Sequence, residues 1–344
     1  MNEIKELLRE LCALPSVSGR EKMGMSRLVE LATPYFDEVR TNGFGSALFI
    51  KKSAKAGAPK MLLDAHLDEV GMMVSEIHDG GFLSVIPIGG LDTRVLPATE
   101  VTVYGSEPIF GIVTSVPPHL SGAGNKDVPK FTEIYIDTGY PADRLRELVT
   151  VGDVVEFKAT MTELYGDRVA SKSLDDKACL CAMLDMLRRA DPARLEFDLY
   201  FSVSAQEEVG KNGASMLAYD IRPDIALAAD VNFASGDGIE ARESIEIGKG
   251  PSVDISSLMD VRLTRNIMSL LDKNHMPYQK ICEPMRTSTN ADGLSICASG
   301  IRTALFSIPL ESMHTPSEVV CLGNIKTLSD ILLLVAYTKM EELL

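Results

Sequence analysis

The chain has 344 residues, of which 45% are hydrophobic and 24% are charged, and its formal net charge is −15. This length exceeds what one hydrophobic core usually supports, so we expect two domains. The negative charge argues against binding to nucleic acid or anionic membranes, which require a basic surface. Neither a run of 18 apolar residues nor a signal-peptide pattern is present, so we expect a cytoplasmic protein.

Two helices are predicted near the N-terminus, because apolar residues recur with helical spacing over 4–14 and 21–35. The second helix follows Ser18-Gly-Arg-Glu21, which has the pattern of a capping box and indicates a helix start. A strand is then predicted at 46–50.

The sequence changes in character over residues 71–166. Short strands separated by Gly, Pro and Asp turns are predicted there, at 82–88, 100–104, 109–115, 133–137 and 154–158. We therefore expect a β-rich domain at 71–166 inserted into an α/β domain made of residues 1–70 and 167–344.

Charged side chains follow the ends of buried strands in the flanking segments. The predicted strand at 61–63 leads to Asp64, His66 and Asp68, and the strand at 197–204 leads to Glu207 and Glu208. The strand at 225–229 leads to Asp230, and the strand at 303–308 leads to His314. The pair Asp175-Asp176 instead lies in the first turn of a helix predicted at 178–189, where carboxylates suit the helix dipole. Because ligand sites form at the carboxyl ends of strands in open α/β sheets, we expect these groups to converge.

His66 and His314 are the candidate metal ligands among the five histidines. Asp68 lies two positions after His66 on an extended segment, so its carboxylate can accept the second ring N–H, as metal-binding histidines require. The remaining histidines have no neighbouring carboxylate cluster or lie in a turn, and we predict no function for them: His78, His119 and His275.

Adjacent carboxylates at a buried strand end repel each other unless a cation neutralises them. Glu207 and Glu208 follow a strand too apolar to face water, so one of them can bind a metal while the other acts as a base. Asp175 and Asp176 could be helix caps, the commoner role for aspartate at that position. A carboxylate can also bridge two ions, and two histidines, three carboxylates and a spare glutamate suffice for two divalent metals.

The motifs together resemble the cytosolic metallo-aminopeptidases that include glutamyl and deblocking aminopeptidases and the tetrahedral, dodecameric aminopeptidases of archaea. The resemblance covers nearly the whole chain. It rests on these segments, which occur in the family's order: His66-Leu-Asp68-Glu-Val-Gly71, Ile88-Gly-Gly90, Gly111-Ile-Val-Thr-Ser-Val-Pro-Pro-His119, Leu174-Asp175-Asp176-Lys, Glu207-Glu208-Val-Gly210 and His314-Thr-Pro-Ser-Glu318.

The resemblance implies an α/β fold: a mixed-sheet α/β/α catalytic domain of the zinc-exopeptidase type with an inserted barrel or PDZ-like domain for dimerisation and assembly. It implies two divalent ions per subunit, with zinc suited to the ligands and cobalt or manganese also able to bind. The implied ligands are His66, Asp175 and Asp230 for one ion and Asp175, Glu208 and His314 for the other. Glu207 would be the catalytic base and Asp68 would support His66.

The implied reaction is removal of the N-terminal residue from short peptides. Glu207 takes a proton from a water that bridges the two metals, the hydroxide attacks the peptide carbonyl, and Glu207 returns the proton to the leaving amine. The implied partners are the peptide substrates and other copies of the chain, in a homododecamer built from dimers.

Two segments depart from the family pattern, Thr287-Ser-Thr-Asn-Ala291 and Glu311-Ser-Met313, but neither removes a ligand. Both lie where substrate and subunit contacts are expected. Two other functions stay open: a related deacylase, carboxypeptidase or other amidohydrolase, and a non-catalytic scaffold protein. A scaffold would be expected to have lost ligands, whereas all five and Glu207 are present.

Overall fold

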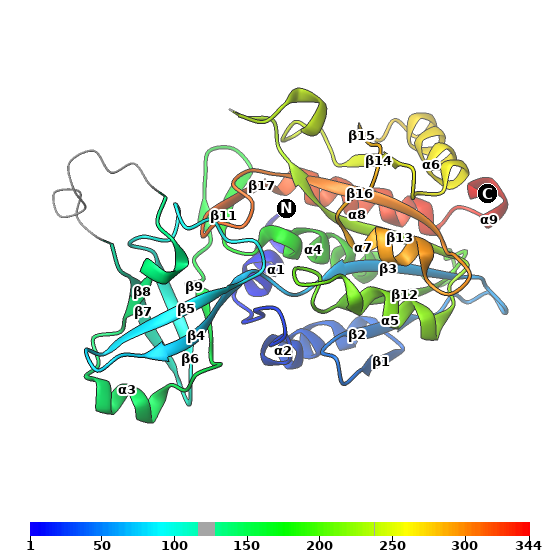
Figure 1. The fold of residues 1–344 in the computed structure, drawn as a ribbon. Coiled ribbons are helices and arrows are strands. Elements are labelled where there is room, and N and C mark those ends of the chain that lie inside the picture. The colour runs from blue at the N-terminus through cyan, green and yellow to red at the C-terminus, as the bar shows by residue number, and fades with distance from the viewer. Residues whose placement is uncertain (116–127, 237) are drawn as a thin grey trace.

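The computed structural model describes residues 1–115, 128–236 and 238–344. It consists of a layered α/β unit with a smaller closed barrel beside it (Figure 1). The motif at 111–119 is described only as far as residue 115, so His119 lies outside the described residues. No helix in the described ranges is both long enough and apolar enough to cross a bilayer.

An eight-stranded mixed sheet forms the centre of the α/β unit, with the strand order β1-β2-β12-β3-β13-β16-β14-β15. The strands are β1 Glu38–Thr41, β2 Ala47–Lys51, β3 Lys60–His66, β12 Asp198–Ser204, β13 Ile225–Phe233, β14 Ser252–Ser256, β15 Gln279–Glu283 and β16 Arg302–Leu310. The four strands β12, β3, β13 and β16 are parallel neighbours. Their carboxyl ends therefore meet at one edge of the sheet, as the sequence predicts for the charged groups.

Helices cover both faces of this sheet (Figure 1). They are α1 Asn2–Cys12, α2 Lys22–Ala32, α4 Leu174–Arg189, α5 Asn212–Ile221, α6 Val261–Lys273, α7 Asn290–Ile296, α8 Leu322–Ala336 and α9 Met340–Leu343. Successive strand side chains point to opposite faces. Leu63 accordingly packs in the core with α1, α4 and α8, whereas its neighbour Leu62 packs in the core with α5 and α7.

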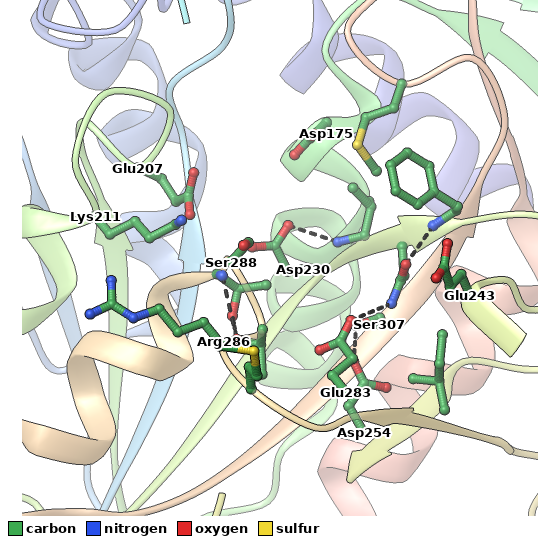
Figure 2. A pocket seen from close by; sticks show the side chains of 18 of the residues that line it. Asp175, Glu207, Lys211, Asp230, Glu243, Asp254, Glu283, Arg286, Ser288 and Ser307 are labelled. Atoms are coloured by element: carbon green, nitrogen blue, oxygen red, sulfur yellow. Dashed lines mark hydrogen bonds between the residues drawn. The ribbon is translucent and has the colours of Figure 1, made fainter. Parts of the chain in front are cut away.

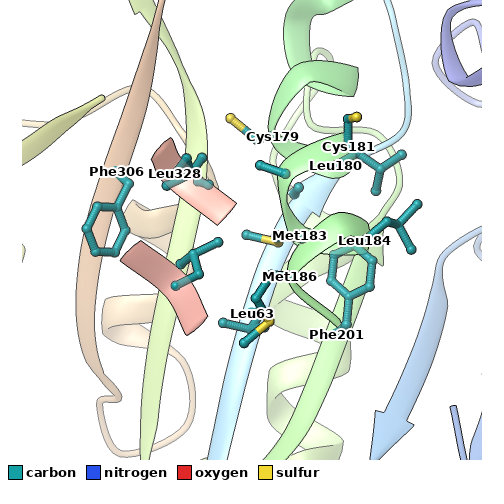
Figure 3. Close-up of a cluster of buried hydrophobic side chains, with 14 of the residues drawn as sticks. Leu63, Cys179, Leu180, Cys181, Met183, Leu184, Met186, Phe201, Phe306 and Leu328 are labelled. Atoms are coloured by element: carbon teal, nitrogen blue, oxygen red, sulfur yellow. The ribbon is translucent and has the colours of Figure 1, made fainter. Parts of the chain in front are cut away.

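The helix α4 lies at the centre of the larger core. All of its residues from Leu174 to Leu187 are buried, and Figure 3 shows Met183 and Met186 among Leu63, Phe201 and Leu328. The helix predicted at 178–189 is present, but Asp175 and Asp176 at its start have non-helical backbone angles. Their carboxylates are thereby displaced from the regular first turn.

The segment between β3 and α4 forms the barrel, with the closed order β4-β5-β8-β7-β6-β9. Its elements are β4 Gly71–Ile77, β5 Phe82–Ile88, β6 Glu100–Tyr104, β7 Pro108–Val113, β8 Tyr135–Asp137, α3 Ala142–Leu148 and β9 Val154–Phe157. Side chains alternate along its strands: Ile109 and Val113 are buried in the barrel's own core, whereas Phe110 and Ile112 are exposed.

A three-stranded sheet leads the chain from the barrel to α4. It contains β10 Thr162–Glu163, β11 Arg168–Ser171 and β17 Glu318–Cys321. Three short 3-10 helices complete the described elements: η1 Thr33–Tyr35, η2 Phe131–Glu133 and η3 Ala241–Glu243.

A buried charge network joins the barrel to the α/β unit. Lys172 lies after β11, and its Nζ donates to both carboxylate oxygens of Glu69 at 2.8 Å. The Nζ of Lys177 on α4 donates to Glu69 at 3.2 Å. Glu156 on β9 lies 3.8 Å from Lys172, and burial raises the pKa of Glu156 to about 7. Both lysine side chains are fully buried. The junction is therefore stable only if the positive charges of Lys172 and Lys177 compensate the negative charges of Glu69 and Glu156.

The helix start predicted at Ser18-Gly-Arg-Glu21 is confirmed, but the contacts of a capping box are not formed. The second helix begins at Lys22, and Ser18 does not cap it, because the Ser18 hydroxyl donates to the carboxylate of Asp68. The Glu21 carboxylate accepts the backbone N–H groups of Gly19 and Gln206. Ser18 and Glu21 therefore make contacts other than those of a capping box. The contact of Glu21 with Gln206 fixes the loop after β12.

Candidate metal centre

The carboxyl edge of the sheet brings five predicted ligands together in two groups. In each group the potential ligand atoms lie within 4.8 Å of one another. The first group contains His66, Asp175 and Asp230, and the second contains Asp175, Glu208 and His314. Asp175 belongs to both groups, as the resemblance implies for a bridging ligand.

The two oxygens of Asp175 face different histidines. Its Oδ1 lies 3.1 Å from Nε2 of His66, and its Oδ2 lies 3.2 Å from Nε2 of His314. The same His314 nitrogen lies 3.2 Å from Oε1 of Glu208, and the Nε2 of His66 lies 3.9 Å from Oδ1 of Asp230. Burial alone would raise the pKa of Asp175, but its hydrogen bonds to both histidines outweigh burial and lower the pKa.

Glu318 holds the backbone of two members of the second group, a contact that the sequence did not predict. Its buried carboxylate accepts the backbone N–H of His314 at 2.7 Å and that of Asp175 at 3.1 Å. The only sequence signal was its place at the end of the segment His314-Thr-Pro-Ser-Glu318. Glu318 therefore fixes the backbones of Asp175 and His314 relative to each other.

Backbone carbonyls orient both histidine rings. Nδ1 of His66 donates to the backbone oxygen of Asp68 at 2.9 Å, and Nδ1 of His314 donates to that of Gly90 at 2.9 Å. The Asp68 carboxylate, expected to be the acceptor, lies 3.7 Å from the His66 ring. That carboxylate is occupied elsewhere, because it accepts the backbone N–H groups of Glu207 and Glu208 at 3.0 and 3.1 Å.

Glu207 lies in neither group of ligands. Its side chain is buried, and its Oε1 has no hydrogen-bond partner among the described residues. Burial raises the pKa of Glu207 to about 7, with the charges of Glu208 and Asp175 adding to the effect. A carboxylate held in this state exchanges its proton near neutral pH, which suits a general base.

A cavity of about 1270 Å³ opens beside these groups. Asp175, Glu207, Asp230 and His314 are among its lining residues, and Figure 2 shows the first three of them. The two segments that depart from the family pattern also contribute, through Thr287, Ser288, Thr289 and Met313. Both departures therefore line the cavity beside the proposed metal centre.

The other residues singled out in the sequence lie outside the two groups. Asp176 is fully buried, and Asp64 is a buried acceptor for Ser202, Ser204 and Asn290 below the site. His78 contacts Ser84 within the barrel. Residues of β14 and β15 that line the cavity, Asp254 and Glu283, were missed; a lone aspartate inside the apolar strand Ser252–Ser256 was the available signal.

A mixed-sheet α/β/α unit with an inserted barrel, and with paired carboxylates and histidines at the strand ends, defines an exopeptidase-type hydrolase. The chain matches the M42 glutamyl aminopeptidase family over residues 45–331. It belongs to that family and is an aminopeptidase.

Individual relatives agree with this assignment. The lysyl aminopeptidase of Pyrococcus furiosus is 32% identical over 320 residues, which cover 91% of each chain. The structure of an aminopeptidase from Desulfurococcus kamchatkensis superimposes with a TM-score of 0.92 at 30% identity, covering 99% of this chain and 97% of that one. The TET1 peptidase of Pyrococcus horikoshii, which can assemble into a tetrahedron or a large octahedral shell, gives a TM-score of 0.86 at 26% identity over 97% and 99% of the two chains.

Proposed function

We propose that the chain removes the N-terminal residue of short peptides with two divalent metal ions and with Glu207 as general base. The observation that carries this proposal is the position of Asp175, which presents one oxygen to each of two ligand groups. One ion would be held by His66, Asp175 and Asp230, and the other by Asp175, Glu208 and His314.

The residues present fit such ions. The side chains of Asp175, Glu208 and Asp230 are at least 90% buried, and within the described ranges their ion-pair partners are histidines alone. Buried carboxylates at this density are costly unless cations neutralise them. Imidazole nitrogen and carboxylate oxygen suit zinc, and cobalt or manganese also bind such a set.

Bound ions would supply Lewis acidity and lower the pKa of water held between them. The residues of the chain would do the rest. Glu207, when ionised, would accept the proton of the attacking water and deliver it to the leaving amine. Asp68 would position Glu207 through the backbone N–H that it accepts.

A panel of substrates tests this function against its alternative, a deacylase or carboxypeptidase of related architecture. Metal-loaded protein is assayed with aminoacyl anilides, with the same anilides acetylated at the α-amine, and with N-acyl amino acids. We expect cleavage of the free-amine anilides only. Release of acyl groups or of C-terminal residues would replace the aminopeptidase by the alternative, and inactivity with every metal would favour the scaffold.

We also propose that residues 71–166 act as a domain for assembly into a homododecamer built from dimers. Four large apolar side chains on the barrel are 39–49% exposed: Phe82, Ile86, Phe110 and Ile112. They lie on β5 and β7, the two strands that flank β8, so they can contribute to one interaction surface. The TET1 peptidase, which has the same fold, can assemble into a tetrahedron or a large octahedral shell. We expect light scattering to give a mass many times 37.4 kDa. Phe110→Asp should reduce that mass, whereas Tyr219→Asp on the exposed face of α5 should not.

A further inference from the structure

A row of polar side chains continues from the metal centre along the same face of the sheet. Asp230 and Asn232 are two residues apart on β13 and so point to the same side. Ser307 on β16 pairs with Asp230, and Ser252 on β14 pairs with Ser307. Asp254, two residues after Ser252, extends the row away from the ligands.

The carboxylates of Asp254 and Glu283 lie at the far end of this row and line the cavity. Asp254 is fully buried and accepts the hydroxyl groups of Ser252 and Ser307. Glu283 on β15 accepts the side-chain amide of Asn232 through Oε1 at 3.1 Å. The Oε2 of Glu283 is buried and has no hydrogen-bond partner among the described residues. One anionic oxygen at the cavity therefore lacks a donor.

The two carboxylates also lack a positive charge. Within the described ranges neither of them forms an ion pair, and burial, together with the charge of Glu283, raises the pKa of Asp254 to about 7. Three arginine and lysine residues line the cavity: Lys211, Arg242 and Arg286. Arg242 forms ion pairs with Glu240 and Glu243, and Figure 2 shows Lys211 and Arg286 on the side of Glu207, away from Asp254 and Glu283.

We propose that Asp254, Glu283 and Asn232 form the subsite for the side chain of the N-terminal residue, and that this subsite selects lysine or arginine. The inference rests on the proposed function, because it assumes that the substrate amine lies at the metal centre. Apolar side chains that line the cavity can contact the methylene stem of such a residue: Ile281, Met285 and Met313. The cationic group at the end of the stem then donates to the unpartnered oxygen of Glu283.

The same geometry disfavours an acidic side chain. A glutamate in this subsite would bring a third carboxylate against those of Asp254 and Glu283, which repel it when they are ionised. A neutral side chain of equal length would leave the oxygen of Glu283 unpaired, which also costs binding energy.

Lysyl and norleucyl anilides provide the sharpest test, because their side chains share the same stem and only lysine carries the ammonium group. We expect kcat/KM for the lysyl substrate to exceed that for the norleucyl substrate by about 10- to 100-fold, the size expected for one buried charge-assisted hydrogen bond. Glu283→Gln and Asp254→Asn should each reduce this ratio at least 3-fold. The control Glu246→Gln removes an exposed carboxylate outside the cavity and should leave the ratio unchanged.

Calorimetry with free L-lysine and L-norleucine gives a second readout on the metal-loaded protein, independent of turnover. Tighter binding of lysine that is lost in Glu283→Gln supports the subsite. Equal binding of the two amino acids, or a preference for glutamyl over lysyl anilide, overturns the subsite while leaving the aminopeptidase intact. Failure to cleave any aminoacyl anilide refutes the proposed function instead, and calorimetry still decides whether the subsite binds a cation.

Discussion

The carboxylate of Asp68 accepts the backbone N–H of Glu207 at 3.0 Å. Asp68, which lies two positions after His66, thus anchors the turn that carries Glu207, the proposed base. Its second oxygen accepts the N–H of the following glutamate, a proposed ligand. A single side chain therefore sets the position of a base and a ligand together.

Asp68→Asn should lower turnover by about 10- to 100-fold, the range typical of residues that support metal ligands. The amide offers only one acceptor oxygen, and its NH₂ group would face a backbone N–H. Turnover and metal content are measured on the same sample. Ser18→Ala, which removes a donor to Asp68 but keeps both acceptors, serves as the control and should have a smaller effect; equal activity of Asp68→Asn and wild type would contradict the positioning role.

Glu207→Gln should keep the metal content and lower turnover by about 10²- to 10⁴-fold, because a positioned general base contributes this much. Glu208→Gln should lose metal, since Glu208 faces His314. Metal analysis of both variants distinguishes the roles. The assignments would have to be exchanged if Glu207→Gln lost metal and Glu208→Gln retained it.

His66→Ala and His314→Ala should each lose mainly one metal equivalent, because the two rings belong to different groups. Asp175→Ala should weaken both sites, since its two oxygens face different groups. Titration of the metal-free protein with zinc measures the stoichiometry. Retention of two equivalents in Asp175→Ala would refute the shared ligand.

Lys172→Met should destabilise the protein by about 3–5 kcal/mol, the cost of breaking a buried ion pair from one side. Glu69 would keep Lys177, but its charge and that of Glu156 would no longer be compensated by Lys172. Adding Glu156→Gln to Lys172→Met should recover part of the loss. Denaturant unfolding measures Lys172→Met, Glu156→Gln and the double variant, and strictly additive effects would show that Lys172 and Glu156 are not coupled.

Asp254→Asn should change how stability depends on pH. Burial raises the pKa of Asp254 from an ordinary 3.8 to about 7, so the folded chain holds a proton that the unfolded chain has already released between these values. Stability is therefore lost as pH rises through this window, by up to ~4 kcal/mol. The unfolding free energy of Asp254→Asn relative to wild type should rise from pH 4 to pH 7 and stay level above it. A difference independent of pH would rule out this titration.

The sequence was sufficient to predict that the five proposed ligands converge, because each follows a strand end or opens a helix. It also indicated a β-rich segment between residues 71 and 166, where the barrel lies. Both inferences use local patterns of apolar residues and turns, which the chain itself displays.

Contacts between distant segments could not be predicted in the same way. Glu283 lines the cavity because β15 pairs with β14 and β14 pairs with β16, an order that no local pattern encodes. The Ser18 hydroxyl matched a helix cap in sequence but bonds Asp68, because the folded chain brings the two together. A local preference such as helix capping is outweighed where the folded chain offers a polar side chain a buried hydrogen-bond partner.

The two ligand groups are completed at different points of protein synthesis. His66, Asp175 and Asp230 have all been made once β13 is translated, whereas His314 follows only after β14, β15 and β16. Because a domain generally folds as a unit, a nascent chain that still lacks His314 cannot complete the second group. The full set of proposed ligands is therefore present only after β16 and the segment that carries His314 have been synthesised.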